Sequence, residues 1–524
     1  MCLTSNDLTR HSYPPGHAWL VALLCLACRF GNAQAPDAPV QQAPTGGFTL
    51  HVETRLVPLD VTVQDRQGHF INDLHASDFS VSDNNVPQKL TSFEAPFEHT
   101  LPHNISAAQL ALGDAKAYGS SALDIIVLDE LNTPFEATVA SRMAIRKYLS
   151  AEPKQLSQPT MLVAINDAGF QMLVNYTTDS QTLIAELDAH RATLPAKLQM
   201  GALDKQLAET FRAIDQIALA SEGLPQRKNL LWVGNGFSGI NTEQLDSATQ
   251  QQLAALVEHM TNRLLAARVT VYKVDPNGVT IAGPDQSSGD SGVSTGAGPY
   301  DAALNFNTFV TQTGGAYFYS RNDLGRALAE GVSEGSHFYS MAYRPSNLSE
   351  DTPYHRITLA TRDPKLVVHV RAGYYTNGDR TADAPLTTAL TELNTAAMEA
   401  IPYTGLAVAV SSLDRGGPDK LSHCHLLLNA DRLTWQPTED GSHYTGELLI
   451  GSTTFSAKNR VLNYSAQRFT VTLSAAQYDA RAKLQPSFAV EVSLPPGAAA
   501  LRIVVRDQGN GHLGSTEMRP IPNL

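Results

Sequence analysis

The chain has 524 residues and a formal net charge of −13. At about 150 residues per domain, this length predicts roughly three folded units. Hydrophobic residues make up 43% and charged residues 17%, which is typical of folded proteins and excludes a disordered or coiled-coil chain. The acidic balance, without basic runs, argues against nucleic acid and anionic membrane as partners.

The first 35 residues have the pattern of an export signal. Arg10 precedes an uninterrupted apolar segment over 18–28, and the small residues that follow allow cleavage after Ala33 or Ala35. The apolar segment is too short to cross a bilayer as a helix. We therefore predict a signal peptide over 1–35 and no transmembrane helix in the mature chain. The mature protein is expected in the periplasm, at the cell surface or secreted. The alternative for the apolar segment 18–28 is a buried hydrophobic helix.

Cysteine use fits an exported protein without disulfides. Cys2, Cys25 and Cys28 lie in the predicted leader, so the mature chain keeps Cys424 alone and cannot form an internal disulfide. A lipoprotein signal that uses Cys25 or Cys28 is a further alternative for the leader. Stability is expected to come from core packing.

A linker and a small β region follow the leader. Residues 36–47 are rich in Pro, Gln, Ala and Gly, a composition typical of a linker. Apolar and polar residues alternate over 48–98, which predicts strands. Asp83-Asn84-Asn85 predicts a turn, because Asn tolerates positive φ.

The segment 115–333 is predicted to be an α/β domain. Strands that are apolar on both faces suit a parallel sheet covered by helices, so we expect a doubly wound, mostly parallel sheet. One helix is expected to begin directly after Asp204, with Asp204 as its N-cap residue. Asp167-Ala168-Gly169 predicts a hairpin that makes 170–175 an antiparallel edge strand. A Gly- and Ser-rich loop is expected over 278–300. The buried strands are predicted at 124–128, 160–165, 229–233 and 269–274.

The remainder of the chain is predicted to be mainly β. Alternation over 337–376 predicts three strands, and His355 at the start of one is expected to face solvent. Our hypothesis is that 337–376 pairs with 48–98 into one sandwich interrupted by the α/β domain. Residues 385–524 open with a helix and continue as a C-terminal β-sandwich domain.

The order of elements resembles the von Willebrand factor type A domain. The segments that carry the resemblance are Asp129 to Thr133, Leu230 to Gly236 and Thr313 to Tyr319. The flanking segments VPLDVTVQDRQGHFINDLHASDFSVSDNNVPQKLTSFE and VRAGYYT look like those of bacterial exported VWFA-related proteins. The resemblance implies a doubly wound α/β fold flanked by β-sandwich elements, and an adhesion-type binding role.

The resemblance also implies a metal-ion-dependent adhesion site at the strand ends. In the family, a D-x-S-x-S loop, a Thr from a second loop and an Asp after the fourth strand hold Mg²⁺, an ion that needs six hard oxygen ligands. Here Asp129 is kept and Thr133 offers the second hydroxyl, but Leu131 replaces the first Ser. Asn235 stands where the later Asp is expected.

The remaining metal ligands are few. The loop 194–204 contains no Thr, so Asp129, Thr133 and Asn235 remain, with Asn132 as a substitute. This set supplies one negative charge for a divalent ion. We therefore expect a degenerate site without a cofactor, in which Asp129 caps a helix or hydrogen-bonds neighbouring loops; bound Mg²⁺ is the alternative.

Other chemistry has less support in the sequence. Residues 236–240 (GFSGI) lack the last glycine of a nucleophile elbow. His423 and His425 could lie on one strand face, but no third metal ligand is in register. We predict a non-enzymatic binding protein whose partner, a protein or cell-surface polymer, contacts Asp129, Asn132, Thr133 and Asn235. The alternatives are an envelope structural or assembly factor and an envelope hydrolase.

Overall fold

A computed structural model describes most of the chain outside the linker and several loops. The expected linker, the apolar leader segment and the loop 278–300 lie outside the described residues. Among the described residues, no helix is both long and apolar enough to span a membrane. The described ranges are 2–12, 56–102, 118–167, 169–192, 202–277, 303–319, 323–346, 353–376, 385–399, 401–416, 421–438, 440–484, 486–519 and 521.

The central unit is built on a six-stranded sheet in the order β13-β11-β9-β6-β7-β8. All neighbours in this sheet are parallel except β8, which runs antiparallel to β7 as the hairpin at 167–169 predicted. Every residue of β6, β9 and β11 is buried, in agreement with their apolar sequences. The strands are β6 (Leu123–Asp129), β7 (Gln155–Asn166), β8 (Gly169–Asp179), β9 (Lys228–Val233), β11 (Val269–Val274) and β13 (Tyr317–Phe318).

Helices cover both faces of this sheet. Successive strand residues point to opposite faces, so Val127 belongs to the core under one helix group and Leu128 to the core under the other. The first group is α4 (Ala202–Ala220), α5 (Ser247–Ala266) and α6 (Phe306–Gln312); the second is α2 (Phe135–Ala151), α3 (Ser180–Ala189) and α7 (Leu324–Ser336). Since α4 begins at Ala202, Asp204 lies inside the first turn and is not its cap, contrary to our expectation.

Two β segments that are far apart in sequence form one unit around a shared core. β14 pairs with β2 and β15 pairs with β3, each antiparallel, which is the pairing that our hypothesis required. The sheets are β16-β2-β14-β5 and β17-β15-β3-β4. Their strands are β2 (Val57–Gln64), β3 (Phe79–Asp83), β4 (Val86–Gln88), β5 (Leu90–Glu94), β14 (Tyr339–Tyr343), β15 (Tyr354–Thr361), β16 (Val367–His369) and β17 (Gly373–Tyr375).

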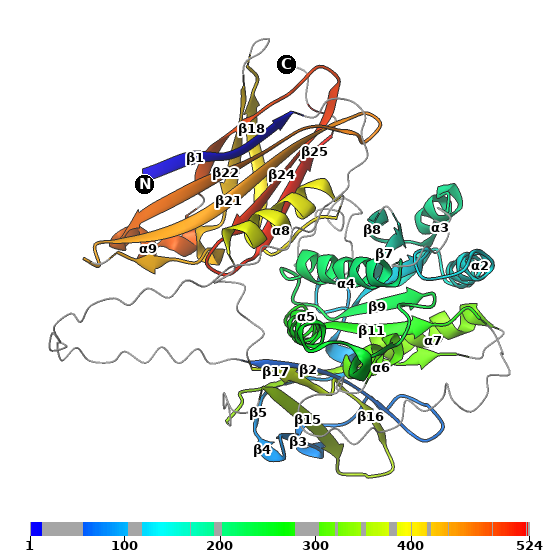
Figure 1. Ribbon diagram of the computed structural model, residues 1–524. Coiled ribbons are helices and arrows are strands. Elements are labelled where there is room, and N and C mark those ends of the chain that lie inside the picture. Colours follow the sequence, from blue (N-terminus) through cyan, green and yellow to red (C-terminus); the bar gives the residue numbers. More distant parts are fainter. Residues whose placement is uncertain are drawn as a thin grey trace.

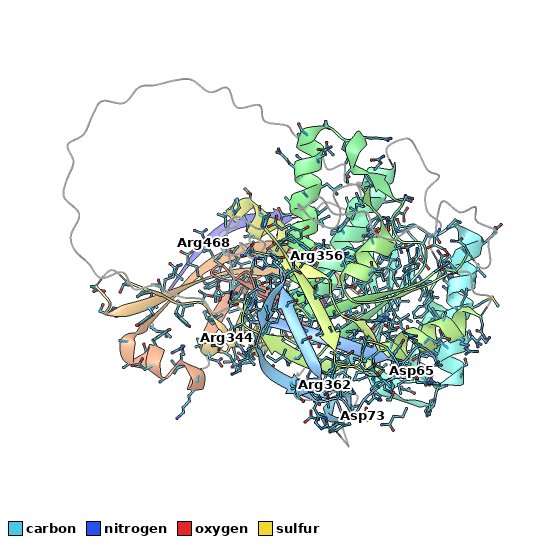
Figure 2. All side chains as sticks on the ribbon, turned by 90° about the horizontal axis from the view of Figure 1, so that it is seen from below. Asp65, Asp73, Arg344, Arg356, Arg362 and Arg468 are labelled. Carbon is cyan, nitrogen blue, oxygen red and sulfur yellow. The ribbon has the colours of Figure 1, made fainter. Side chains whose placement is uncertain are left out.

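Two details of this unit differ from the sequence-based prediction. The last expected strand divides into β16 and β17, which join different sheets. The break lies where the N–H of Ala372 donates to the carbonyl of Gln312 at the end of α6 (3.1 Å). His355 is fully buried instead of facing solvent, because its Nδ1 lies 2.6 Å from Oδ1 of Asp83. Figure 2 shows the exposed side chains of Asp73, Arg356 and Arg362 on the outside of the same unit.

The C-terminal domain begins with α8 (Leu386–Met398) and contains two sheets with a common core. One sheet has the order β18-β19-β23, and the other has the order β1-β22-β21-β24-β25 with β20 beside β21. Its elements are β18 (Val408–Asp414), β19 (Ser422–Leu428), β20 (Gln436–Pro437), β21 (His443–Ser456), β22 (Val461–Ser474), α9 (Ala475–Asp479), β23 (Ser487–Val492), β24 (Ala498–Asp507) and β25 (Leu513–Met518).

The predicted leader contributes one strand to this domain. β1 (Cys2–Ser12) pairs antiparallel with the outer side of β22, from Cys2 opposite Thr472 to Ser12 opposite Asn463. The prediction of a signal peptide did not include a strand in this segment.

The three units follow one another in space (Figure 1). The C-terminal β domain lies at one end, the α/β unit in the middle and the paired β segments at the other end. Backbone contacts join the first two: the N–H of Thr404 donates to the carbonyl of Ala220 at the end of α4 (3.0 Å). The core under α4 and α5 continues into Leu393 of α8.

Candidate functional site

The candidate site lies at the carboxyl ends of β6 and β9. These two strands are parallel neighbours, so the residues that follow them meet at one edge of the sheet. Asp129 ends β6 and is fully buried. Gly234 follows β9, and a Cβ atom at this position would lie 2.4 Å from Cβ of Asp129. Glycine therefore lets the second loop pack directly on the carboxylate.

The carboxylate of Asp129 accepts hydrogen bonds on both oxygens. Oδ1 accepts from the backbone N–H groups of Leu131 (3.2 Å) and Asn132 (2.9 Å). Oδ2 accepts from Nε1 of Trp232 (2.9 Å) and the backbone N–H of Gly236 (2.9 Å). These donors come from β9 and from both loops. Asp129 thus holds the loops together and does not cap α2, whose N-cap residue is Pro134.

The side chain of Asn132 completes this shell of donors. Its Nδ2 lies 3.1 and 3.3 Å from the two carboxylate oxygens of Asp129. The same nitrogen donates to Oγ1 of Thr210 at 3.0 Å. Thr210 lies on α4, so a threonine hydroxyl reaches the site from this helix and not from the loop 194–204, where the family resemblance implies it. Part of that loop, 193–201, lies outside the described residues.

Thr133 and Asn235 join the site through other atoms than predicted. Oγ1 of Thr133 accepts a hydrogen bond from the backbone N–H of Asn235 (3.0 Å). The side-chain Oδ1 of Asn235 accepts from Nδ2 of Asn277, 2.8 Å away. The structure therefore brings Asp129, Asn132 and Thr133 together, while the Asn235 side chain contacts a third loop.

Burial shifts the pKa values of Asp129 and Lys273 toward their neutral forms, and their polar or charged neighbours act in the opposite direction. Burial raises the pKa of the Asp129 carboxyl, and N–H groups of Asn132, Trp232 and Gly236 counteract this by stabilising the carboxylate. Lys273 on β11 is a nearby cation. Burial lowers its pKa, whereas the negative charges of Asp275 and Asp129 act in the opposite direction.

The residues present do not fit a divalent cation. A metal ion needs free oxygen lone pairs, but those of Asp129 face N–H donors, and Asn132 turns its nitrogen toward the carboxylate. A nitrogen donor thus contacts the carboxylate and the Thr210 hydroxyl, two groups suited to a cation. Among the described residues, no three His, Cys, Asp or Glu side chains converge in a metal-binding group.

Other polar groups near this edge of the sheet also form hydrogen bonds within the chain. Oε1 of Glu130 lies 3.0 Å from Nε2 of His190, and both side chains are almost fully buried. Away from the site, His423 is exposed and His425 pairs with Asp414 at 2.9 Å. Gly236 of the GFSGI segment donates its N–H to Asp129. Ser238 of the same segment does not have the positive φ of a strained serine.

The sequence analysis missed Trp232, Thr210 and His190. Trp232 stands inside a strand that reads as uniformly apolar, and its indole N–H was the available signal, because a buried indole usually finds an acceptor. Thr210 and His190 belong to elements whose distance from Asp129 and Glu130 depends on the tertiary fold.

Comparisons with known proteins give only distant similarities. No known family model and no curated protein matches the chain. Proximal thread matrix protein 1 from the mussel byssus is 10% identical over 41% of this chain and 48% of its own, with a TM-score of 0.24. This chain thus spans about half of that protein.

Two further solved structures, one of them a VWA domain, are also similar. The SpRpn10 VWA domain is 20% identical over 30% of this chain and 74% of its own, with a TM-score of 0.17. The manganese-loaded TRAP protein of Plasmodium vivax is 10% identical over 46% and 94%, with a TM-score of 0.24. Function must therefore be argued from the contacts of this chain.

Proposed function

We propose that the chain is an exported, non-catalytic binding protein. Its central unit is a doubly wound sheet of the von Willebrand factor A type with a degenerate metal site, and it holds a protein partner without a metal ion. The contact surface consists of the Asp129 edge and an apolar stripe on α2.

The stripe is the observation that carries this proposal. Phe135, Val139 and Met143 are 54%, 40% and 67% exposed. Their spacing of four residues places them on one face of α2. The helix begins two residues after Thr133, so the stripe continues directly from the Asp129 loop. Soluble proteins rarely expose grouped apolar side chains unless these bind a partner.

The opposite face of α2 has an ordinary structural role. Ile145 and Leu149 are fully buried in the core beneath the sheet. The helix thus has apolar residues on two faces, and packing within the described chain accounts for only one of them.

The polar groups of the edge support binding without catalysis. Asp129 is enclosed by N–H donors, and the Glu130 and His190 pair is shielded from solvent. A general acid or base must reach the proton that it transfers, and none of these three side chains is exposed to a ligand.

Photo-crosslinking in the native host tests this proposal. A benzoylphenylalanine at position 139 should give a discrete adduct with a partner protein, and the same probe at the exposed control position Ser150 should not. The adduct should persist in chelator and disappear when Met143→Glu is added. No adduct at 139, an equal adduct at 150, or loss of the adduct in chelator would contradict the proposal.

A second candidate function is docking of other exported chains by the C-terminal domain. The outer edge of β22 already accepts β1 as an added strand. Removal of a leader over 1–35 would leave this long edge open to another extended segment. A peptide of residues 2–12 should then bind a chain that starts at Pro36 but not the full chain. Failure to bind the shortened chain would remove this candidate.

A further inference from the structure

A cavity of about 520 Å³ opens beside the candidate site. It lies between α4, α5 and the segment that follows β9, and Figure 1 shows the two helices next to each other. β10 (Ile240–Asn241), which pairs with β12 (Ala303–Leu304), forms part of its wall. Cavities of this size are typical of small-molecule sites.

The walls of the cavity are apolar and incompletely covered. Leu207 comes from α4, Leu253 and Leu256 come from α5, and Phe237 and Ile240 come from the connecting segment. All of these except Phe237 are only partly buried. An apolar ligand in the cavity would remove their remaining surface from water, which is favourable.

The described polar side chains that line the cavity carry no charge. Gln206, Asn241, Gln244 and Gln252 supply amides, and Ser238 and Thr249 supply hydroxyl groups. Asp246 is close in sequence, but its carboxylate caps α5 by accepting from the N–H groups of Ala248 and Thr249, each at 3.0 Å. Among these described lining residues a charged ligand would lose hydration without meeting an opposite charge, whereas a neutral polar group can be satisfied by amides.

One wall of the cavity is firmly supported from behind. The ring of Phe237 stacks on Phe211 at a centroid distance of 5.3 Å and meets the edge of Phe306 at 5.2 Å. Gln206, another lining residue, donates to the carbonyl of Leu131 at 3.1 Å. The cavity is therefore present before any ligand arrives.

We propose that this cavity is a binding site for a neutral small molecule with an apolar body and one hydrogen-bonding group. The body lies against Leu207, Leu253 and Leu256, and the polar group meets the lining amides. This site is distinct from the apolar stripe on α2.

Fluorescence titration of the full chain with the neutral probe N-phenyl-1-naphthylamine tests the proposal. Saturable binding is expected. Leu253→Trp, which fills the cavity, should weaken it by about tenfold or more. Ile240→Trp fills the cavity from the opposite wall and should weaken probe binding in the same way. If circular dichroism shows that one variant does not fold, the other variant still tests the proposal. Met143→Glu, which alters the stripe on α2, should leave probe binding unchanged.

Competition with matched ligands tests the chemical class. Decanol should displace the probe, and decanoate, which has the same chain length but a negative charge, should be about tenfold weaker or worse. Absence of saturable binding, indifference to both tryptophan variants, or equal competition by decanoate would overturn the proposal. Loss of probe binding in Met143→Glu would place the probe on α2 and would also overturn it.

Discussion

Asn132 determines the chemistry of the strand-end site, because its amide nitrogen contacts Asp129 and Thr210 at once. A single nitrogen here can donate two hydrogen bonds, which suits a carboxylate and a hydroxyl that face each other. The loops around the site are thus joined by hydrogen bonds of the chain itself.

Asn132→Asp should make the stability of this site depend on metal. The change replaces a donor by a second carboxylate beside a buried one, so the free energy of unfolding should fall by about 1–3 kcal/mol in chelator. Millimolar Mg²⁺ or Mn²⁺ should restore part of this loss. Urea denaturation with and without metal measures both effects.

The wild-type chain and the exposed variant Asn241→Asp are the controls for this experiment. In thermal melting, both should have the same midpoint temperature in Mg²⁺ and in chelator. A rise of several degrees for the wild type in Mg²⁺ would show that a cation binds in spite of the N–H donors.

Asp124, at the other end of β6, should make stability fall as pH rises. Burial raises its pKa to about 7, although Asn229 and Arg227 act against this. In the unfolded chain its pKa is about 4. Between these values the unfolded chain has lost a proton that the folded chain keeps, so the free energy of unfolding decreases with pH, by at most about 1.4 kcal/mol per unit.

Asp124→Asn should remove this contribution. Urea denaturation at pH 5, 6 and 7 should show that the free energy of unfolding falls less with pH, or rises more, in the variant than in the wild type. Glu399, whose pKa burial also raises to about 7, keeps its own share of the slope in both proteins. Identical slopes would contradict the assignment to Asp124.

The segment between β9 and α5 has a second position, after Gly234, at which the backbone requires glycine. Gly236 has φ +67°, and a Cβ atom there would lie 2.3 Å from Cγ of Phe306. Both the left-handed conformation and the contact oppose a side chain. The backbone N–H of Gly236 also donates to Asp129, so a shift of this residue would disturb the hydrogen bonds of the site.

Gly236→Ala should lower the free energy of unfolding by about 2 kcal/mol or more. Gly239→Ala is the matched control, because its nearest contact would be Cβ of Asn305 at an ordinary 3.7 Å. Chemical denaturation of the two variants measures the difference. Equal losses would mean that the loop can move away from Phe306.

Elements were easier to predict from the sequence than contacts between them. The apolar runs identified β6, β7, β9 and β11, because strands buried on both faces cannot carry many polar residues. The contacts of Asp129 with Trp232 and of Asn132 with Thr210 span 103 and 78 residues of sequence. No local pattern specifies such distances, so only Asp129, Asn132 and Thr133 could be placed in the site beforehand.

His355 shows the same limit in the β unit. A histidine at the start of an alternating strand usually faces solvent, but here the buried Asp83 of a distant segment pairs with it. The carboxylate that changes its environment lies 272 residues away in sequence.

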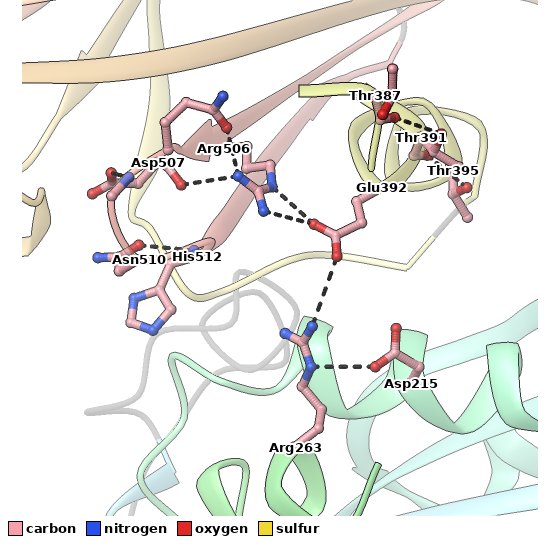
Figure 3. Close-up of polar contacts among 12 residues, drawn as sticks. Asp215, Arg263, Thr387, Thr391, Glu392, Thr395, Arg506, Asp507, Asn510 and His512 are labelled. Atoms are coloured by element: carbon pink, nitrogen blue, oxygen red, sulfur yellow. Dashed lines mark hydrogen bonds and ion pairs between the residues drawn. The ribbon is translucent and has the colours of Figure 1, made fainter. Parts of the chain in front are cut away.

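On the scale of the whole molecule, Glu392 of α8 links the C-terminal domain to the α/β unit (Figure 3). Its Oε2 lies 2.9 Å from Nη2 of Arg506, and its Oε1 lies 4.0 Å from Nη2 of Arg263 on α5. Arg263 is also held by Asp215 on α4 at 3.3 Å. The junction therefore contains a network of charges as well as an apolar core.

Glu392→Ala should destabilise this junction by about 3 kcal/mol, because the side chain of Arg506 is 1% exposed and would lose the one carboxylate that forms an ion pair with it among the described residues. Asp188→Ala, which breaks the exposed ion pair with Arg146, should cost no more than about 1 kcal/mol. Urea denaturation compares the two variants. Equal costs would show that the junction does not depend on this network.

The pairing of β2 with β14 has a consequence for biosynthesis. Strand β2 ends at Gln64, and its partner β14 begins at Tyr339. At ribosomal speeds of about 5–20 residues per second, β2 must wait roughly 15–55 s for its neighbour to emerge. During that interval its apolar face stays uncovered, which makes the nascent chain a client for chaperones. The delay also keeps this part of the chain unfolded until Tyr339 has been synthesised.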